Sequence, residues 1–391
     1  MNKYIFFDGK LLKRAGGPTT YLYNLKNGLY NRNDDSINFI YDDSIDEIKS
    51  ENGGLYNKIK NILSKFNFIY TRLYFVKRHK CSKIYTELSK VKDGDIIMFH
   101  KTIDLVKALP FLPNNVTKIL MSHSPEIQAK EIAKILKNKN NRCNEKYVEK
   151  RYFEEFDKPA FEKADIIVFP SEDAMEPYYQ TCNNFSQIIK NKRIEYIETG
   201  TEELKFDFFK DEFRKIHNIP KDAFVLSFIG RHNEVKGYDS FIKIGNEMLK
   251  RHHNFYIITA GIGEIKSPRN DRWIDIGWTN DPGSVANCSD LFVLPNKRTY
   301  FDLILLEMLS IGKTCLVSNT GGNRTISNYT AGVITYDDID SAIETIEKLY
   351  NDKALNERLG KLNQKIYNER YTIDAFANRY IDFFNKVENK K

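Results

Sequence analysis

The 391-residue sequence predicts a two-domain α/β protein with a parallel sheet in each domain. Its length is too great for one compact core and suits two domains of about 150 to 200 residues each. Short runs rich in β-branched and aromatic residues alternate along the chain with longer segments of helical periodicity. These runs are almost continuously apolar, which is typical of strands whose two faces are both covered by helices.

Two series of candidate strands follow one another along the chain. The first series occupies residues 4–8, 37–41, 95–100, 118–123, 165–171 and 193–199. The second occupies residues 224–230, 255–261, 273–278, 290–296, 314–319 and 332–336. Strands separated by helices in two successive series predict two Rossmann-like domains that face each other, with any ligand in the cleft between them.

The domain boundary is expected near Gly200, where a strand in "IETGTEELKFD" ends and polar residues follow. We therefore predict an N-terminal domain over residues 1–200 and a C-terminal domain over residues 201–370. The last segment, residues 371–391, carries apolar side chains at helical spacing (Ile373, Phe376, Tyr380 and Phe383). We expect it to form a helix that packs back on the N-terminal domain.

Composition indicates an ordinary globular protein, with 29% charged and 41% hydrophobic residues. No apolar run approaches the roughly 20 residues of a transmembrane helix, and the start "MNKYIFFDGK" lacks the features of a signal peptide. The five cysteines are scattered and lack CxxC spacing, so we interpret them as free thiols of a reducing compartment, without zinc. These features predict a cytoplasmic protein.

The net charge of +7 is mild, but one segment, residues 57–92, is strongly basic and rich in aromatic residues. Glu87 is its single acid, against Lys58, Lys60, Lys65, Arg72, Lys77, Arg78, Lys80, Lys83, Lys90 and Lys92. Such a segment is either a solvated face beside the core or a surface for anionic lipid, where basic and aromatic side chains combine well. No recognisable nucleic-acid-binding module accompanies it.

The loop after the first candidate strand reads "GKLLKRAGGPTTYLYNL". Gly16 and Gly17 leave backbone N–H groups unshielded, and Pro18 suits the first turn of a helix. A phosphate or a crowded sugar can be received at such a helix start. The same sequence is also common in strand-to-helix turns that bind nothing.

The loop after the strand at 224–230 places Arg231 and Lys236 before a helix whose core-facing stripe includes Phe241 and Met248. Two cations near a helix N-terminus can hold a diphosphate, with Arg gripping two oxygens and Lys acting as a point charge. Solvation at the surface is the alternative interpretation.

The third and fourth loops follow the strands at 290–296 and 314–319. In the third, "NKRTYFD" leads into the apolar helix "LILLEMLSIG", where Glu307 is costly to bury without a partner. Ribose hydroxyls or a neighbouring Lys or Arg would supply that partner. The fourth loop, "NTGG", offers further backbone N–H groups.

These motifs together resemble the retaining GT-B glycosyltransferases of family 4. That family reads strand–Gly-Arg, then Lys-Gly and a helix, then an acid, an apolar run and a second acid, then a Gly-Gly loop. "IGRHNEVKG", "TYFDLILLEMLSIG" and "NTGG" follow that order with the expected spacing. "GGPTTYL", "ADIIVFPSEDAM" and "IETGTEELKF" are also similar, so the resemblance spans most of the chain.

The resemblance implies roles for residues that would hold the donor nucleotide. Arg231 and Lys236 would hold its diphosphate, and Leu303 and Glu307 would line its nucleoside, with Glu307 on the ribose. Family members of this kind need no metal and no cofactor. The "DGD" sequence at residues 93–95 is accordingly interpreted as a turn.

The resemblance also implies residues near the reacting sugar and the acceptor. Gly16 and Gly17 would line the phosphate and acceptor side, and His123 would lie near the donor sugar. Thr299 stands where the family has its first, sugar-contacting acid, and Asp302 stands where it has glycine. Thr-x-x-Asp before an apolar helix is also a capping-box pattern. Either the cap preserves the loop and Asp302 or Thr299 meets the sugar, or the sugar subsite is lost.

Three functions remain open on this reading. The first is a metal-independent, retaining hexosyltransferase that moves a sugar from a nucleotide donor, by family habit a UDP-sugar, to a glycan or lipid-linked acceptor in surface polysaccharide assembly. It would act in the cytoplasm, at the inner face of the membrane where residues 57–92 meet anionic lipid. The second is a catalytically silent partner of another glycosyltransferase, and the third is a nucleotide-sugar epimerase that works by acid/base chemistry.

Overall fold

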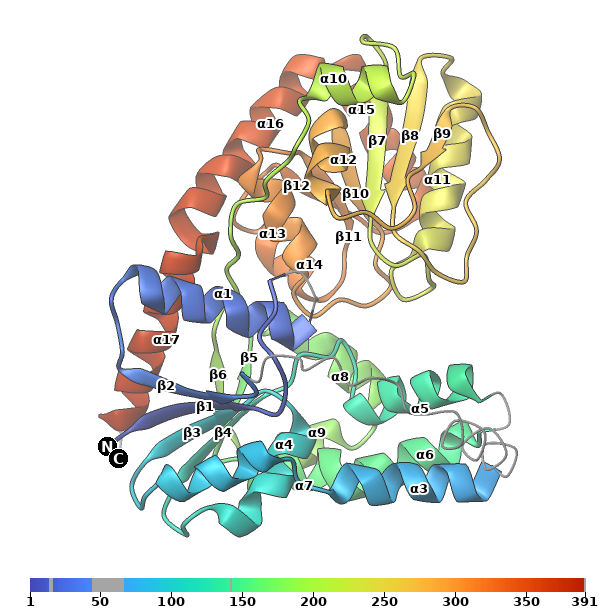
Figure 1. Ribbon diagram of the computed structural model, residues 1–391. Helices are drawn as coiled ribbons and strands as arrows, with labels where there is room; N and C mark the ends of the chain where they lie inside the picture. The colour runs from blue at the N-terminus through green and yellow to red at the C-terminus, as the bar shows by residue number, and fades with distance from the viewer. Residues whose placement is uncertain (14–16, 44–66, 141–142, 390–391) are drawn as a thin grey trace. The chain divides into compact units, whose positions relative to one another are not determined.

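The computed structural model describes residues 1–13, 17–43, 67–140 and 143–389, and the chain divides into two compact units (Figure 1). The first unit comprises Met1–Phe169, Tyr178–Ile197 and Arg379–Lys391, and the second comprises Pro170–Pro177 and Glu198–Asn378. Residues 170–177, which the sequence analysis assigned to the N-terminal domain, thus belong to the second unit.

Within its described residues, the first unit holds a six-stranded parallel sheet in the order β2-β1-β3-β4-β5-β6. The strands are β1 (Lys3–Phe7), β2 (Ile37–Tyr41), β3 (Ile96–Phe99), β4 (Thr117–Met121), β5 (Ile166–Phe169) and β6 (Arg193–Tyr196). The helices are α1 (Gly17–Asn31), α3 (Asn67–His79), α4 (Thr102–Ala108), α5 (Gln128–Lys139), α6 (Glu145–Tyr152), α7 (Lys158–Lys163), α8 (Glu176–Thr181, of which 178–181 belong here) and α9 (Phe185–Ile189).

The second unit holds, among its described residues, a six-stranded parallel sheet in the order β12-β11-β10-β7-β8-β9. The strands are β7 (Phe224–Ile229), β8 (Phe255–Ala260), β9 (Trp273–Asp275), β10 (Leu291–Leu294), β11 (Cys315–Ser318) and β12 (Val333–Tyr336). The helices are α10 (Lys210–Ile216), α11 (Tyr238–Arg251), α12 (Pro282–Cys288), α13 (Leu303–Ser310), α14 (Gly321–Ser327), α15 (Ile339–Asn351) and α16 (Lys353–Ile366).

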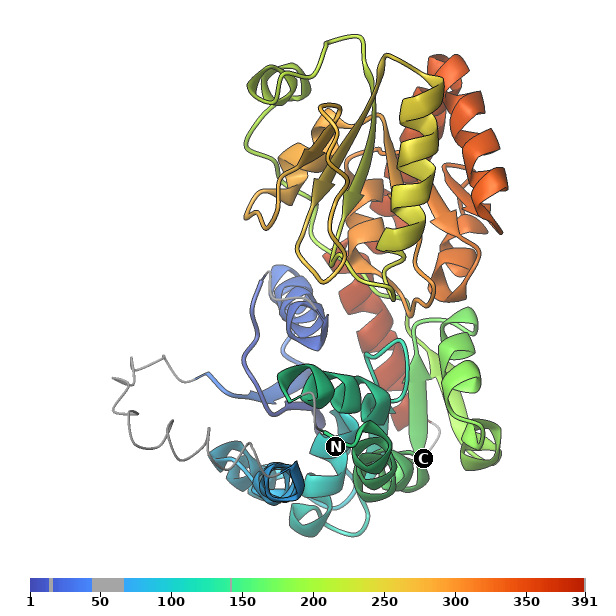
Figure 2. The ribbon, with the colours of Figure 1, turned by 90° about the vertical axis from the view of Figure 1, so that its right-hand side faces the viewer.

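The predicted fold class of two parallel α/β sheets is confirmed, and each predicted strand overlaps an observed one. The physical reason lies in burial: every residue of β1, β3, β5, β7 and β10 is buried, as a strand covered on both faces requires. Helix α11 lies along the second sheet (Figure 2), and its apolar stripe, Phe241, Ile244 and Met248, joins the core cluster of that unit.

The last helix, α17 (Ile373–Glu388), contributes residues up to Asn378 to the second unit and residues from Arg379 to the first. In the first unit its Tyr380 hydroxyl lies 2.8 Å from the Tyr21 hydroxyl of α1. Phe384, one turn later, is fully buried. The apolar spacing of this segment therefore corresponds to an observed helix with a buried stripe.

Each sheet has a point where the strand order reverses. In the first sheet the chain runs outward from β1 to β2 and then returns to β3 on the other side of β1. In the second it runs from β7 out to β9 and returns to β10 on the other side of β7. In open parallel sheets, ligands bind at the carboxyl ends of the strands at this reversal. We therefore expect a ligand site at the loops after β7 and β10.

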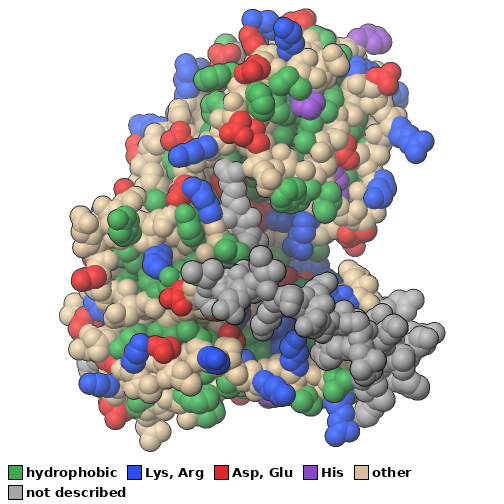
Figure 3. Space-filling model, in the orientation of Figure 1, with side chains coloured by type: hydrophobic (Ala, Val, Ile, Leu, Met, Phe, Trp, Pro, Cys, Tyr) green, Lys and Arg blue, Asp and Glu red, His purple; other side chains and the backbone are tan. Residues whose placement is uncertain are grey.

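The basic aromatic segment is described only from residue 67 onward, and residues 57–66 lie outside the described residues. On α3, Leu73 and Val76 are about half exposed (49% and 50%), and Arg72 and Lys77 are exposed beside them. Lys80, which directly follows the last residue of the helix, is exposed as well. On the face of the molecule drawn in Figure 3, basic and acidic side chains are interspersed. None of the described helices is long and apolar enough to cross a membrane.

Candidate functional site

The loop after β7 is pressed against the chain that follows β10. Gly237, the residue before α11, has a φ of +67°, and a Cβ there would lie 1.7 Å from the carbonyl oxygen of Pro295. Only glycine fits both the left-handed conformation and the close approach. The Lys297 amide also donates to the Val235 carbonyl at 3.0 Å. The second and third predicted loops are therefore in direct contact at the sheet's reversal point.

An ion pair joins these two loops. The Lys236 ammonium lies 2.8 Å from each carboxylate oxygen of Asp302, and the Asn296 side-chain amide donates to the same carboxylate. Burial on its own would raise the pKa of Asp302. The Lys236 charge, together with hydrogen bonds from Lys236 and Asn296, outweighs burial and holds that pKa below its usual value. Asp302 is therefore an ionised counter-ion to Lys236.

The capping-box interpretation of Thr299 and Asp302 is wrong. Helix α13 begins at Leu303, so Asp302 is itself the N-cap residue and makes no side-chain capping hydrogen bond. A capping box would have required Asp302 to lie three residues inside the helix. Its carboxylate points instead to Lys236, because a nearby ammonium is a stronger partner for a carboxylate than a backbone N–H.

The fourth loop packs on the third. A Cβ on Gly321, whose φ is +45°, would lie 2.1 Å from the Thr299 carbonyl oxygen, and one on Gly322 would lie 2.3 Å from that of Tyr300. The Gly321 N–H donates to the Glu176 carboxylate at 2.9 Å, so this N–H is already engaged within the second unit. Thr299 is 2% exposed beneath this contact. A buried position of this kind suits a neutral hydroxyl better than an unpaired acid.

The other predicted donor residues lie on the loop after β7 and on α13. Arg231 is exposed in the loop after β7, and its guanidinium has no ion-pair partner among the described residues. Leu303 and Glu307 are half-buried one helical turn apart on α13 and share a side of that helix. The structure thus brings Arg231, Lys236 and Asp302 to neighbouring strand-end loops, while contact of Glu307 with a ribose stays a prediction.

His123, after β4 of the first unit, is paired with a second histidine. Its Nε2 lies 2.7 Å from Nδ1 of His100, which directly follows β3, and the two rings stack with centroids 5.0 Å apart. Burial lowers the pKa of His123 to about 3, and burial together with His123 and Lys101 places that of His100 well below its usual value. Both rings are therefore neutral at pH 7, and one nitrogen donates to the other.

The edge of Tyr21 from α1 packs on the His123 ring, with centroids 4.4 Å apart. This contact ties the histidine to the helix that begins at Gly17, an exposed residue with a φ of +56°. Pro18 lies in the first turn of that helix, as its sequence suggested. Gly16, the other glycine of the predicted pair, lies outside the described residues.

Two residues of these clusters were missed by the sequence analysis. Asn296 is 1% exposed and holds Asp302, and its signal was its place directly after the strand-ending Pro295. His100 ends the run "DIIMFH" just as His123 ends "KILMSH". Because β3 and β4 are parallel neighbours, two histidines at corresponding strand ends are brought together.

Comparison with known proteins finds a family match within the second unit. Residues 209–366 match the family Glycosyl transferases group 1. The chain is 27% identical over 185 residues to "UDP-Gal:alpha-D-GlcNAc-diphosphoundecaprenol alpha-1,3-galactosyltransferase" of Escherichia coli, covering 43% of this chain and 48% of that protein. It is 24% identical over 226 residues to "Capsular polysaccharide biosynthesis glycosyltransferase CapM" of Staphylococcus aureus, covering 52% and 60%. The matches thus span about half of each of these relatives.

Solved structures share the fold over nearly the whole chain. Sucrose-phosphate synthase from Thermosynechococcus elongatus matches with a TM-score of 0.61 and 15% identity over all of both chains. Anabaena Alr3699/HepE, in complex with UDP and glucose, matches with a TM-score of 0.58 and 12% identity over 98% of this chain and 100% of that one. The predicted resemblance to GT-B glycosyltransferases of family 4 is thereby confirmed.

Proposed function

We propose that this chain, whose residues 209–366 form a Glycosyl transferases group 1 domain, transfers a sugar from a nucleotide-sugar donor with retention of anomeric configuration. The observation that carries the proposal is the meeting of loops at the reversal point of the second sheet. There Arg231 and Lys236 follow β7, and Lys236 pairs with Asp302 in the loop that follows β10. This is where an open parallel sheet binds a nucleotide, and two cations suit its diphosphate.

The donor we propose is a UDP-sugar. A relative of the chain is named for UDP-Gal, and a structural neighbour is described in complex with UDP and glucose. In this proposal Arg231 and Lys236 neutralise the charge that develops as the nucleoside diphosphate leaves. Glu307, with Leu303 beside it on α13, binds the ribose.

His123 serves the sugar in this proposal as a neutral group. With its pKa lowered to about 3 by burial, its imidazole adds no charge at pH 7 and acts as a hydrogen-bond donor or acceptor. Its bond to His100 engages the Nε2 atom and fixes which way the ring faces. Thr299 and Asp302 complete the loop that faces the donor sugar.

The acceptor we propose is a glycan, carried on a lipid, in the assembly of surface polysaccharide. Relatives are named for a diphosphoundecaprenol-linked acceptor, for capsule and for O-antigen. The exposed side of α3 supports a peripheral place on an anionic membrane, because Leu73 and Val76 stand beside Lys77 and Lys80.

A thermal-shift screen of UDP, GDP, ADP and their sugars tests the proposal. A nucleotide at 100 times its dissociation constant stabilises a fold by about 2.7 kcal/mol. We expect UDP and a UDP-sugar to raise the melting temperature of the parent chain more than that of the double variant Arg231→Ala/Lys236→Ala. A flat response to every nucleotide contradicts the proposal.

One observation favours a second function, that of a catalytically silent partner. Asp302 already occupies Lys236, which a donor diphosphate would need. A silent partner predicts no response to any nucleotide in the same screen. A chain that binds a UDP-sugar and turns it over contradicts this second function.

A further inference from the structure

A pocket of about 210 Å³ opens at the amino edge of the second sheet. Its walls include the residues directly before three strands: Ala223 before β7, Asp290 before β10 and Thr314 before β11. The proposed donor loops follow the carboxyl ends of the same strands. The pocket therefore lies at the opposite edge of this sheet and belongs to a different site.

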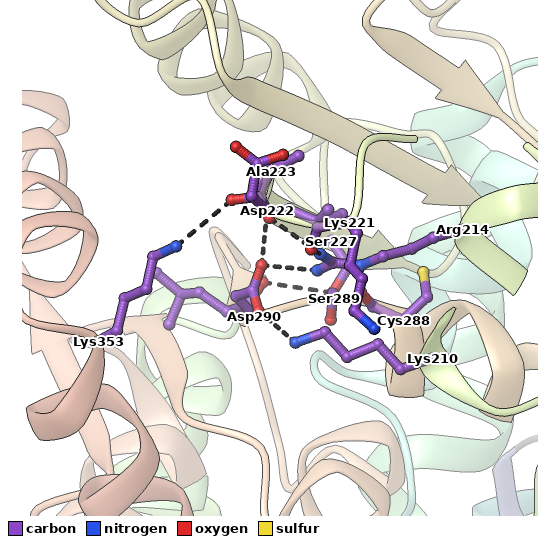
Figure 4. Close-up of polar contacts among 12 residues, drawn as sticks. Lys210, Arg214, Lys221, Asp222, Ala223, Ser227, Cys288, Ser289, Asp290 and Lys353 are labelled. Carbon is purple, nitrogen blue, oxygen red and sulfur yellow. Dashed lines mark hydrogen bonds and ion pairs between the residues drawn. The ribbon is translucent and has the colours of Figure 1, made fainter. Parts of the chain in front are cut away.

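A single carboxylate in the wall is shared by two cations (Figure 4). Asp290 lies 2.8 Å from the Arg214 guanidinium and 2.6 Å from the Lys210 ammonium. Burial on its own would raise the pKa of Asp290, but these two cations hold it below its usual value. Arg214, 2% exposed, donates its other bonds to the carbonyl oxygens of Cys288, Lys221 and Ala223. Two cations, Arg214 and Lys210, thus neutralise one carboxylate.

Lys313 adds a third cation to the same wall. Its ammonium donates to the carbonyl oxygens of Ser289 and, at 3.4 Å, Asn287, which do not cancel its charge. Burial lowers the pKa of Lys313 to about 8. The positive charges of Lys210 and Arg214 also lower this pKa, whereas the negative charge of Asp290 raises it. A buried ammonium with this surrounding gains from any anion that enters the pocket.

The rim of the pocket carries a further cation. Lys353, the first residue of α16, donates to the Asp222 carbonyl at 3.4 Å (Figure 4). The exposed Lys221 also lines the pocket, but its ammonium is paired with Asp211 at 2.7 Å. Counting Glu357 and Asp222 as well as Asp290, the lining side chains include five cations and three acids.

We propose that this pocket binds a small phosphate-type anion, either inorganic phosphate or the phosphate of a small monoester. Its size lies below the roughly 300–1,000 Å³ of pockets for drug-sized ligands, so a whole nucleotide sugar is not the occupant. Lys313 contacts the anion from the floor and Lys353 from the rim. Arg214 and Lys210 hold Asp290 neutralised, so that this carboxylate does not repel the anion.

Titration calorimetry of the full chain with inorganic phosphate, and separately with glycerol phosphate, tests this site. Ionic strength is kept constant with chloride. We expect saturable binding by the parent and a loss of roughly tenfold in affinity for Lys353→Gln, because a charge-assisted contact is worth about 1.5–3 kcal/mol. Lys313→Met is expected to lose more. The control is Lys348→Gln, an exposed lysine of α15 that does not line the pocket.

Phosphate binding at this pocket can be distinguished from UDP binding at the proposed donor site. The double variant Arg231→Ala/Lys236→Ala is expected to bind phosphate like the parent, and Lys353→Gln is expected to bind UDP like the parent. Tighter binding of glycerol phosphate than of phosphate identifies a monoester as the occupant, and the reverse order identifies inorganic phosphate. The proposal is overturned when the parent shows no saturable binding, or when Lys353→Gln equals it. Lys353→Gln is an exposed substitution, so it decides the matter even where Lys313→Met does not fold.

Discussion

Replacing Asp302 with Asn is expected to increase the affinity for UDP. The carboxylate of Asp302 lies 2.8 Å from the Lys236 ammonium through both oxygens, so an incoming diphosphate competes with it for the same cation. Asn has the same size and keeps an oxygen for Lys236 and for the Asn296 amide, but it carries no charge. The substitution therefore removes a competing anion with little change of shape.

The magnitude follows from the geometry. A phosphate that shares Lys236 with Asp302 stands on the order of 5 Å from that carboxylate, which gives a repulsion of about 3 kcal/mol at an effective dielectric constant of 20. The Lys236 and Asp302 side chains are 22% and 21% exposed, so solvent screening reduces this repulsion, to about 1.5 kcal/mol. We expect a dissociation constant for UDP that is lower by roughly tenfold. The free variant should also melt earlier, since Lys236 loses its counter-ion.

Titration calorimetry with UDP, on parent and variant, measures this difference. Asp239→Asn is the matched control: it makes the same change of charge on α11 and breaks a surface pair with Lys297 (2.8 Å). Unchanged UDP affinity in Asp302→Asn would show that Asp302 and the diphosphate do not compete. Weaker binding would show that the carboxylate holds Lys236 in the orientation that the ligand needs, and would also refute the reasoning.

Three further results are expected. Arg231→Ala/Lys236→Ala should weaken UDP binding by roughly ten- to 100-fold, more than it lowers the melting temperature; unchanged affinity by calorimetry would place the diphosphate elsewhere. The folded chain holds His123 neutral with a pKa of about 3, against 6.5 when exposed, so its contribution to stability is complete above about pH 6.5 and is lost as the pH falls towards 3. His123→Gln should therefore unfold less steeply over that range in acid titrations followed by circular dichroism, and an identical acid limb would contradict its buried, neutral state. Lys77→Gln/Lys80→Gln should reduce cosedimentation with anionic vesicles, since each basic group contributes about 1 kcal/mol there. Equal cosedimentation of variant and parent would show that these two lysines do not contribute to membrane binding.

The strands were predictable because burial on both faces leaves a strong local signal. "FVLSFI" and "LFVL" correspond to β7 and β10, every residue of which is buried. Helix α11 was equally clear, since Phe241 and Met248 recur at helical spacing and both face the core. In each case the local pattern of apolar residues was enough to predict which faces of the strand or helix are buried.

The His100–His123 pair needed information that no local pattern holds. The two residues are 23 positions apart, and only the pairing of β3 with β4 brings their side chains to 2.7 Å. That pairing depends on the order of the strands in the sheet, which follows from the packing of the whole unit. His123 was found through its resemblance to a family position, whereas His100 had no such guide.

The Thr299–Asp302 pair shows why a correct motif led to an incorrect interaction. The spacing of a capping box is a local feature, and it was present. The ion pair that replaced it joins Asp302 to a lysine 66 residues away, across the reversal between β7 and β10. The family pattern has an acid at position 299 and glycine at position 302; this chain keeps one acid in the loop but moves it by three residues. At 299 an acid would stand in a position that is 2% exposed, whereas at 302 it reaches Lys236. An acid at 302 therefore keeps a negative charge in the loop and pairs it with Lys236. In the donor site that we propose, Lys236 also holds the diphosphate, so the affinity of Asp302→Asn for UDP is the most informative single measurement on this site.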